Sequence, residues 1–421
     1  MRISAPLTLS IGVFAASLVA CGETGPASRP FTAMQAAENT SVGHSGSRFS
    51  VLFSFDKTDG GWPNNVDLIK VSGMLYGTTS TGGVSRPSCR VSAGCGIVFS
   101  ITPSGMEKTL YRFKGGRNGG TPYAGLINVN GTLYGTTYVG GEHGCGTVFS
   151  ITSTGTQRVL HSFGSGTDGC EPQGALVNVH GTLYGTTQFG GKVACYGLGC
   201  GTVFGITTAG KERVLYDFGA FPDGNQPVAG VLELKGTLYG TTATGGSGQG
   251  CGSSGGCGTV FGVTTAGKER VLHSFAGGFS NDGATPIAGL VEVDGMLYGT
   301  TEGGGSGQGS YGGGGTVFSL TTSGQERILH SFAGSPDGAA PEARLTYLDG
   351  KFYGTTCGGG AANVGTIFSV TMAGDERIRY SFGGGSIVCP AGAVTAIKRA
   401  LYGVTYQGGS HNWGTVYRLK P

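Results

Sequence analysis

The sequence predicts an all-β fold, a seven-bladed β-propeller built from four-stranded blades, on three observations. Glycine supplies 87 of the 421 residues, yet 38% of the residues are hydrophobic, which is enough for a core if the glycines are organised. One pattern of short apolar segments recurs seven times from residue 49 onward. The array has a surplus segment at its N-terminal end and lacks the matching one at its C-terminal end, which indicates a closed ring.

The most recognisable segment of the repeat reads Leu-Tyr-Gly-Thr-Thr, with small departures in the last two copies. Its tyrosines are Tyr76, Tyr134, Tyr184, Tyr239, Tyr298, Tyr353 and Tyr402. Ahead of it stands Pro-x-Ala-Gly-Leu-Val, and behind it follow Gly-Thr-Val-Phe and Arg-Val-Leu-His-Ser-Phe. Each segment is short, rich in Val, Thr, Phe, Tyr and Leu, and bounded by glycine-containing turns, which is typical of β-strands.

We name these segments A (Ala-Gly-Leu-Val), B (Leu-Tyr-Gly-Thr-Thr), C (Gly-Thr-Val-Phe-Ser-Ile) and D (Val-Leu-His-Ser-Phe) in chain order. Two-residue turns such as Asn130-Gly131 and Asp294-Gly295 separate A from B. Such turns close β-hairpins, because Asn, Asp and Gly tolerate positive φ. Four short antiparallel strands every 49 to 59 residues, seven times over, favour a β-propeller.

The two ends of the array complement each other. It opens with residues 49–55, a D segment with no A, B or C before it, and closes with residues 414–419, a C segment without its D. We therefore expect the N-terminal strand to complete the last blade, so that one strand comes from one end of the chain and three from the other. Such closure removes the exposed strand edges that an open array would carry.

The quoted B, C and D blocks resemble those of the bacterial tandem-repeat proteins called GloVer, which are described as choice-of-anchor proteins because their copies carry different surface anchors. The resemblance covers about residues 49–421 and rests on seven copies of the blocks. It implies an exported, lipid-anchored propeller. It brings no activity and no catalytic residues that can be carried over.

The first residues predict export. Arg2 precedes a mostly apolar stretch over residues 3–19, and Leu18-Val19-Ala20-Cys21 resembles a bacterial lipobox. We interpret residues 1–20 as a lipoprotein signal peptide and Cys21 as the acylated residue; an ordinary secretory signal that happens to contain a Cys is the alternative. Residues 21–48 then form the lipidated Cys and a flexible tether, rich in Gly, Ser, Pro, Ala and Thr. We expect a lipid-anchored protein of the bacterial cell envelope, and Gly22 in place of Asp favours the outer membrane.

Composition excludes several classes of function. The 27 basic and 24 acidic residues leave a net charge of +3, whereas a nucleic-acid-binding protein needs a basic surface. No internal apolar run is long enough for a transmembrane helix. No phosphate-binding loop, nucleophile elbow or metal-ligand spacing is present, so we expect no cofactor and no metal. We also expect a monomer.

The cysteines predict disulfides. Ten remain once Cys21 is set aside, an even number that suits an oxidising compartment. All ten fall in B–C loops or D–A crossings, which lie on one face of a propeller. The expected pairs are Cys89–Cys95, Cys145–Cys170, Cys195–Cys200, Cys251–Cys257 and Cys357–Cys389. Metal binding is the alternative, which the absence of any Cys-x-x-Cys disfavours.

We interpret residues that recur at one position of the repeat as structural rather than functional. His161, His273 and His330 occupy the slot in D that other blades fill with Phe or Tyr, so we interpret them as packing rather than catalytic. We interpret the glutamates at the start of D as exposed charged residues that protect an outer edge strand. They are Glu212, Glu269, Glu326 and Glu376.

Aspartates recur in the D–A crossing, each before a Gly, at Asp59, Asp168, Asp223, Asp282 and Asp337. We interpret them as turn residues whose side chains accept backbone N–H bonds. The alternative, which stays open, is a ring of carboxylates near the channel mouth that binds a cation.

Residues that break the repeat are the candidates for ligand binding, and they gather on the face of the B–C loops. Arg344 replaces a small residue of segment A, and Glu342, two residues earlier, is expected on the same side. The others are Glu142, His143, Glu171, Trp62, Trp413 and His411, with Tyr311 in a nearby loop. Aromatic rings with carboxylates and an arginine would suit a sugar chain.

The function we favour is a binding or interaction module of the cell envelope whose ligand is a glycan or a surface protein. A carbohydrate-active enzyme, such as a polysaccharide lyase or glycosidase with its site on the B–C loop face, is the first alternative, by analogy of fold alone. The second is a purely structural envelope protein. Catalytic residues stay unknown at this stage.

Overall fold

The computed structural model describes residues 48–421 except 65, 90–91, 194, 196, 252–254, 279–280, 308–312, 384–386 and 391. Contacts join these described residues into one compact unit. The predicted signal peptide, Cys21, nearly all of the predicted tether and Tyr311 lie outside the described residues. Among the described residues, no helix has the length and apolar character needed to cross a bilayer.

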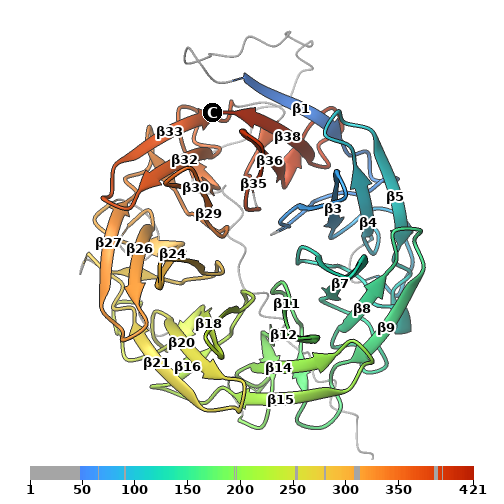
Figure 1. Ribbon diagram of the computed structural model, residues 1–421, viewed down its shortest axis with the longest axis horizontal. Coiled ribbons are helices and arrows are strands. Elements are labelled where there is room, and N and C mark those ends of the chain that lie inside the picture. The colour runs from blue at the N-terminus through green and yellow to red at the C-terminus, as the bar shows by residue number, and fades with distance from the viewer. Residues whose placement is uncertain are drawn as a thin grey trace, which may run out of the picture. The chain divides into compact units, whose positions relative to one another are not determined.

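Seven four-stranded antiparallel sheets stand around a central axis as the blades of a propeller, which confirms the predicted fold (Figure 1). Blade 1 contains β2 (Ile69–Val71), β3 (Met74–Thr79), β4 (Ile97–Ile101) and β5 (Glu107–Arg112). Blade 2 contains β6 (Ile127–Val129), β7 (Thr132–Thr137), β8 (Thr147–Ile151) and β9 (Gln157–Ser162). Blade 3 contains β11 (Val177–Val179), β12 (Thr182–Thr187), β14 (Thr202–Thr207) and β15 (Glu212–Asp217). Blade 4 contains β17 (Leu232–Leu234), β18 (Thr237–Thr242), β20 (Thr259–Thr264) and β21 (Glu269–Ser274).

The remaining blades follow the same order. Blade 5 contains β23 (Val291–Val293), β24 (Met296–Thr301), β26 (Thr316–Thr321) and β27 (Glu326–Ser331). Blade 6 contains β29 (Thr346–Leu348), β30 (Lys351–Thr356), β32 (Thr366–Thr371) and β33 (Glu376–Ser381). Blade 7 contains β35 (Thr395–Ile397), β36 (Ala400–Thr405), β38 (Thr415–Lys420) and β1 (Arg48–Ser54).

Short two-stranded ladders tie five of the D–A crossings to the neighbouring B–C loops. They join β10 (Gly169–Cys170) to β13 (Phe189–Gly190), β16 (Gly224–Asn225) to β19 (Thr244–Gly245), and β22 (Gly283–Ala284) to β25 (Gly303–Gly304). They also join β28 (Gly338–Ala339) to β31 (Gly358–Gly359), and β34 (Ile387–Val388) to β37 (Gln407–Gly408). Among the described residues one 3₁₀ turn, η1 (Gly116–Asn118), is present, in the crossing from blade 1 to blade 2.

The innermost strand of each blade is shorter than the sequence predicts. Strand β23 begins at Val291, after the Ala-Gly-Leu of segment A, and pairs with β24 through Val293 and Met296. The two residues between them, Asp294 and Gly295, have φ of 52° and 81°, as expected for a tight hairpin turn. The Ala-Gly-Leu triplets are therefore extended segments at the centre of the ring rather than ladder residues.

The outermost strands run along the rim, as β9, β15, β21, β27 and β33 show in Figure 1. In every blade the pairing of the two outer strands shifts register once, as between Val317 and Phe318 in blade 5. Such a bulge increases the local twist of a strand pair. The twist carries the end of one rim strand toward the start of the next, so consecutive blades meet along the rim.

The predicted closure is confirmed. Strand β1 pairs with β38 antiparallel, with Ser50 opposite Arg418 and Ser54 opposite Thr415. The first strand of the described chain thus completes the last blade and leaves no strand edge open between blades 7 and 1.

The core lies between the blades. At each of the seven junctions, the aromatic residue that ends one rim strand meets a ring on the third strand of the next blade edge-on, with centroids 5.0 to 5.7 Å apart. The glycine of Leu-Tyr-Gly leaves room for that ring, because a Cβ on Gly299 would lie 2.6 Å from Phe318. Threonines add hydrogen bonds between blades, for example from Thr186 Oγ1 to the Ala229 carbonyl at 2.7 Å.

Candidate functional site

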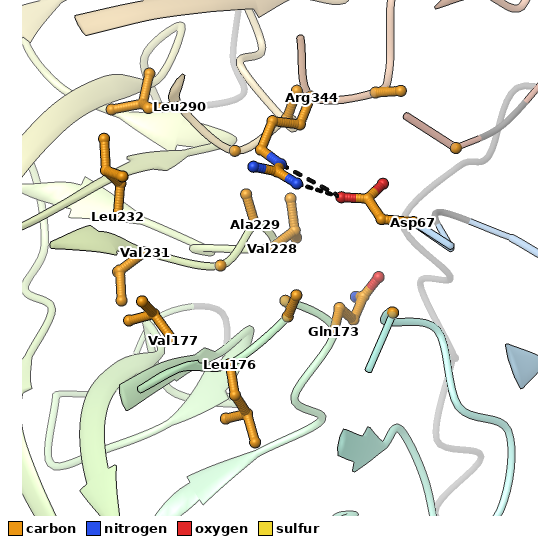
Figure 2. A pocket seen from close by; sticks show the side chains of 18 of the residues that line it. Asp67, Gln173, Leu176, Val177, Val228, Ala229, Val231, Leu232, Leu290 and Arg344 are labelled. Carbon is orange, nitrogen blue, oxygen red and sulfur yellow. Dashed lines mark hydrogen bonds and ion pairs between the residues drawn. The ribbon is translucent and has the colours of Figure 1, made fainter. Parts of the chain in front are cut away.

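All seven blades contribute to a central cavity of about 280 Å³, part of which is shown in Figure 2. Its wall consists mostly of the Ala-Gly-Leu triplets, so small and aliphatic side chains such as Leu176, Val228 and Leu290 dominate it. Four polar side chains interrupt this wall, those of Asp67, Gln173, Glu342 and Arg344. The cavity is thus an apolar ring with a few convergent polar groups, the usual character of a ligand site.

The middle residue of each triplet occupies one equivalent slot around the ring. In chain order the seven residues are Asp67, Gly125, Ala175, Gly230, Gly289, Arg344 and Ala393. Close contact between neighbouring triplets explains the small residues, since a Cβ on Gly230 would lie 2.2 Å from the Ala175 carbonyl oxygen. Only two of the seven blades place a charged side chain there, one of each sign.

These two charged residues bind each other across the ring, as Figure 2 shows. Arg344 donates from Nη2 and Nε to Oδ2 of Asp67, at 3.1 and 3.3 Å. The other Asp67 oxygen accepts the backbone N–H of Ala393 at 3.0 Å. The side chain of Arg344 is 48% exposed, so part of its guanidinium stays open to the cavity.

Sequence comparison within the chain singles out Arg344 but misses Asp67. The signal was available, because Asp67 occupies the same triplet slot in blade 1 that Arg344 occupies in blade 6. The first triplet reads Val-Asp-Leu rather than Ala-Gly-Leu, and this departure hides its membership of the repeat.

Glu342 lines the same cavity as Arg344, in agreement with the expectation that the two residues share a side. Protein surrounds its carboxyl, and this burial, with Glu302 nearby, raises its pKa to about 8. Burial also raises the pKa of Glu302. Near neutral pH the Glu342 carboxyl is therefore largely protonated, and one of its oxygens lies within 4.8 Å of the sulfur atoms of Cys357 and Cys389.

Trp62 and Glu171 occupy another repeated slot, the residue before the proline that ends each D–A crossing. Its seven residues are Trp62, Thr121, Glu171, Gln226, Thr285, Ala340 and Cys389, and all have positive φ between 49° and 59°. In each blade the carbonyl of this residue accepts the N–H of the residue that follows Leu-Tyr-Gly-Thr-Thr. The backbone at this slot is constant while the side chain varies, which is the pattern of a scaffold that carries recognition residues.

The two tryptophans come together where the ring closes. Trp62 stacks on Trp413, with ring centroids 5.1 Å apart and planes 19° apart, and Tyr406 lies 5.8 Å from Trp62. Lys57 Nζ lies 5.7 Å from the centre of the Trp413 ring. His411, in the same loop as Trp413, is exposed, and its Nδ1 lies 3.1 Å from Ser410 Oγ.

All five predicted disulfides form. Their Cα–Cα distances run from 4.2 to 5.4 Å, and they join Cys89–Cys95, Cys145–Cys170, Cys195–Cys200, Cys251–Cys257 and Cys357–Cys389. The bridge from Cys145 to Cys170 places Glu171 beside the second loop, where its N–H donates to the Cys145 carbonyl at 2.7 Å. Glu142 and His143 are exposed in that loop.

The recurring histidines and aspartates form pairs at the rim. Nε2 of His161 lies 2.8 Å from Oδ2 of Asp168, and the pairs His273–Asp282 and His330–Asp337 repeat this contact at 3.4 and 3.1 Å. Each histidine also meets a phenylalanine edge-on, as packing residues should.

The aspartates of these pairs act as turn residues, as expected, because Oδ1 of each accepts the N–H of the following glycine at 2.7 Å. Their carboxylates lie against the rim strands. The channel mouth is therefore the wrong location for the ring of aspartates that the cation alternative assumed.

The glutamates at the start of the rim strands are not surface cover. Glu212, Glu269, Glu326 and Glu376 are half-buried, and Oε1 of each is enclosed without a hydrogen-bond partner. Burial, together with a neighbouring aspartate, raises the pKa of each to about 7. Linear spacing hides these contacts, because each glutamate belongs to the repeat after the one that supplies its neighbouring aspartate.

Comparisons with known proteins identify the repeat. The family model for the Gloeobacter/Verrucomicrobia repeat matches residues 40–252, 88–311 and 249–421. None of the curated proteins matches the chain in sequence.

Several solved structures match most of this chain at low sequence identity. A puromycin-hydrolysing peptidase from Mycobacterium tuberculosis is 12% identical with a TM-score of 0.52 over 88% of this chain, which spans 54% of that protein. A gluconolactonase from Xanthomonas campestris, 12% identical, has a TM-score of 0.43 over 89% of this chain and 90% of its own. A sialidase from Trypanosoma rangeli, 12% identical, has a TM-score of 0.40 over 89% of this chain and 59% of its own. At such identities the likeness to the peptidase shows the fold alone.

Proposed function

Because the chain belongs to the Gloeobacter/Verrucomicrobia repeat family, we propose that it is an exported, lipid-anchored binding module of the bacterial cell envelope that holds its ligand at the central cavity. The observation that carries this proposal is the Asp67–Arg344 pair. At a slot where five blades keep Gly or Ala, two blades place opposite charges that meet in the cavity. Packing does not require these side chains, since five blades manage without one.

The ligand we propose is one that presents a carboxylate, such as an acidic sugar of a glycan or the acidic end of a peptide. Asp67 engages Nε and Nη2 of Arg344, and the half-exposed guanidinium has further donors for a second carboxylate. Glu342, which lines the same cavity and whose pKa burial raises to about 8, is the second donor that we propose. The aliphatic wall offers contact to carbon atoms, and a cavity of about 280 Å³ suits one sugar unit or one terminal residue.

Two observations support the cell-envelope setting. The five disulfides suit an oxidising compartment rather than the bacterial cytoplasm. The Leu-Val-Ala-Cys sequence that ends at Cys21 fits acylation of that residue after export. Labelling with a fatty-acid analogue, lost in Cys21→Ser, tests the anchor.

Glycan-array binding of the oxidised protein, followed by titration calorimetry with the best acidic hit, tests the ligand site. Arg344→Ala restores the small residue of the sibling blades, so it should keep the fold and weaken binding by about 1–3 kcal/mol, the range for a hydrogen bond to a charged group. Lys268→Ala, an exposed change in a turn between the two outer strands, is the matched control and should bind as the unchanged protein does. Equal affinity of all three proteins would place the ligand elsewhere.

A carbohydrate-active enzyme is the second candidate, and one observation favours it. Glu302 and Glu342 are two neighbouring carboxyls with raised pKa, and one of them lines the cavity beside Arg344. A protonated carboxyl can serve as a general acid. Turnover of a polyuronate or an acidic oligosaccharide that disappears in Glu342→Gln would support the enzyme, whereas binding without turnover supports the module.

A further inference from the structure

We propose that three clusters at the rim bind divalent transition-metal ions, with Zn²⁺ as the best fit. We call them the rim clusters, and each combines one His, one Asp and one Glu. They are His161–Asp168–Glu212, His273–Asp282–Glu326 and His330–Asp337–Glu376. In each, one ligand atom from every residue lies within 4.8 Å of the other two.

Each rim cluster joins two blades. In the first, His161 lies on β9 of blade 2, Asp168 lies in the crossing that follows, and Glu212 begins β15 of blade 3. The other two clusters repeat this arrangement between blades 4 and 5 and between blades 5 and 6. A metal ion bound there would bridge neighbouring blades at the rim, where the outer strands meet.

Other junctions of the same ring show that the fold does not need this chemistry. Between blades 1 and 2 the three slots hold Tyr111, Asn118 and Gln157, so all three metal ligands are replaced together. The ring closes at that junction as it does elsewhere. Aspartate and glutamate are therefore retained or lost as a pair, which indicates a joint role that packing alone does not explain.

Two further junctions keep the carboxyls without the histidine. Tyr216, Asp223 and Glu269 occupy the slots between blades 3 and 4. Phe53, Asp59 and Glu107 occupy them between blades 7 and 1. These junctions serve as internal controls, because they retain the acidic pair and lack the nitrogen ligand.

The glutamate of each rim cluster has an unused ligand atom. Oε1 of Glu212, Glu326 and Glu376 is enclosed by protein, yet it has no hydrogen-bond partner, and Oε1 of Glu269 shares this state at a junction that lacks the histidine. An enclosed carboxylate oxygen beside an aspartate is unfavourable unless a cation or a proton compensates it. A metal ion would satisfy this oxygen and neutralise the acidic pair in one step.

The donor set selects the metal. One imidazole nitrogen and two carboxylate oxygens suit Zn²⁺, whereas Ca²⁺ and Mg²⁺ prefer oxygen ligands alone. Zn²⁺ bonds of about 2.0–2.2 Å put neighbouring ligand atoms of a tetrahedral shell roughly 3.3–3.6 Å apart, so Nε2 of His161 and Oδ2 of Asp168, now 2.8 Å apart, must separate slightly to admit the ion. Water can complete the shell. The site can be reached from solvent, because the His161 side chain is 20% exposed.

Protons must leave when the metal binds. In the metal-free protein Nε2 of His161 donates to Asp168, so the imidazole must present the Nε2 lone pair with its proton on Nδ1. A protonated glutamate must release its proton to solvent. Because these protons compete with the metal ion for the same atoms, uptake should strengthen with rising pH.

The test is equilibrium dialysis of the oxidised, chelator-treated full chain against micromolar ZnCl₂, with the thermal midpoint recorded beside it. We expect three equivalents of Zn²⁺ and a higher midpoint in its presence. His161→Tyr should remove one equivalent, and the triple variant His161→Tyr, His273→Tyr and His330→Tyr should remove all three. Tyrosine fills this slot at Tyr216, so the variants should fold.

Two more variants keep the result interpretable. His180→Asn, a change in an exposed turn where blade 2 carries Asn130, should retain three equivalents. Glu326→Gln, which introduces the residue that blade 2 carries at Gln157, should weaken one site about tenfold or more. Absence of uptake in the unchanged chain, or equal uptake by the triple variant, would overturn the proposal.

Discussion

At the scale of single residues, the central triplets show how a repeat can carry a site. Gly and Ala fill most of the slot because neighbouring triplets touch through their backbones, as at Gly230 and Ala175. Asp67 and Arg344 are the exceptions. One is acidic and the other basic, and their side chains form an ion pair. A position that tolerates small residues in most blades and carries a charge in two is a position where the charge serves something other than packing.

The two partners of this pair should differ in their effect on stability. Arg344→Ala restores the sibling residue and should change the free energy of unfolding by less than about 1 kcal/mol, since half-exposed ion pairs contribute little. Asp67→Ala should cost about 1–3 kcal/mol, because it also leaves the buried N–H of Ala393 without its acceptor. Urea denaturation of both variants measures the difference, and equal losses would mean that the arginine is a structural clamp.

Two glycines of the same slot offer a matched pair. A Cβ at Gly230 would lie 2.2 Å from a backbone oxygen, whereas one at Gly289 would meet the flexible Arg344 side chain at 3.4 Å. Gly230→Ala should therefore destabilise the protein by about 1–3 kcal/mol through overpacking. Gly289→Ala should be neutral or slightly stabilising, by at most about 1 kcal/mol. Thermal or chemical denaturation separates them, and a tolerated Gly230→Ala would contradict the tight ring of triplets.

At the scale of elements, the rim strands determine how the blades join. The bulge in each outer pair turns the rim strand along the circumference, and the glutamate that begins it comes to lie against the previous blade. Two strands from different repeats thus create an environment that neither repeat contains alone. The half-buried glutamates owe their raised pKa to this contact.

The rim glutamates predict how stability depends on pH. Burial raises the pKa of Glu107, Glu212, Glu269, Glu326 and Glu376 from 4.5 to about 7. The folded state then holds these protons more tightly than the unfolded chain, so their stabilisation is complete below about pH 4.5 and disappears as the pH rises through 7. Denaturant midpoints in metal-free buffer should fall across this window.

A variant identifies the groups responsible. Glu269→Gln cannot titrate and should flatten the pH dependence, while Glu142→Gln, in an exposed loop, should leave it unchanged. The aspartates with lowered pKa, Asp282 and Asp337, act below pH 3.8 and lie outside the window. A midpoint that rises from pH 4.5 to 7 would contradict this account.

At the scale of the whole molecule, closure by β1 holds the two ends of the ring together. Residues 48–54 pair with β38, and Phe55 packs edge-on against Phe99 of blade 1. The last blade therefore lacks its outer strand and its contact with blade 1 unless the N-terminal strand is present. Stability of the ring should depend on that strand and not on the residues ahead of it.

Two truncations test this dependence. Deletion of residues 22–47 keeps β1 and should leave the unfolding midpoint unchanged, because the sequence predicts only a tether there. Deletion of residues 22–56 removes β1 and Phe55 and should lower the midpoint clearly or cause aggregation through the exposed edge of β38. Thermal unfolding followed by circular dichroism distinguishes them, and equal midpoints would mean that the ring closes in another way.

The sequence by itself determined the propeller, its seven blades, its closure and its five disulfides. These features follow from local sequence patterns that recur along the chain: alternating apolar residues, two-residue turns and cysteines in adjacent loops. Comparison between repeats also singled out Arg344 and Glu342 at the cavity. This comparison separated the structural residues from the variable ones, although it could not show in which direction the variable side chains point.

Only the tertiary structure decided which residues meet. Asp67 and Arg344 lie 277 positions apart in the chain, and the ring brings them together because its first and sixth blades face the same small cavity. The sequence predicts that the rim glutamates cover the surface, whereas in the structure neighbouring blades enclose them. Contacts between repeats depend on how the blades twist and close, and that geometry is a property of the whole ring rather than of any one segment.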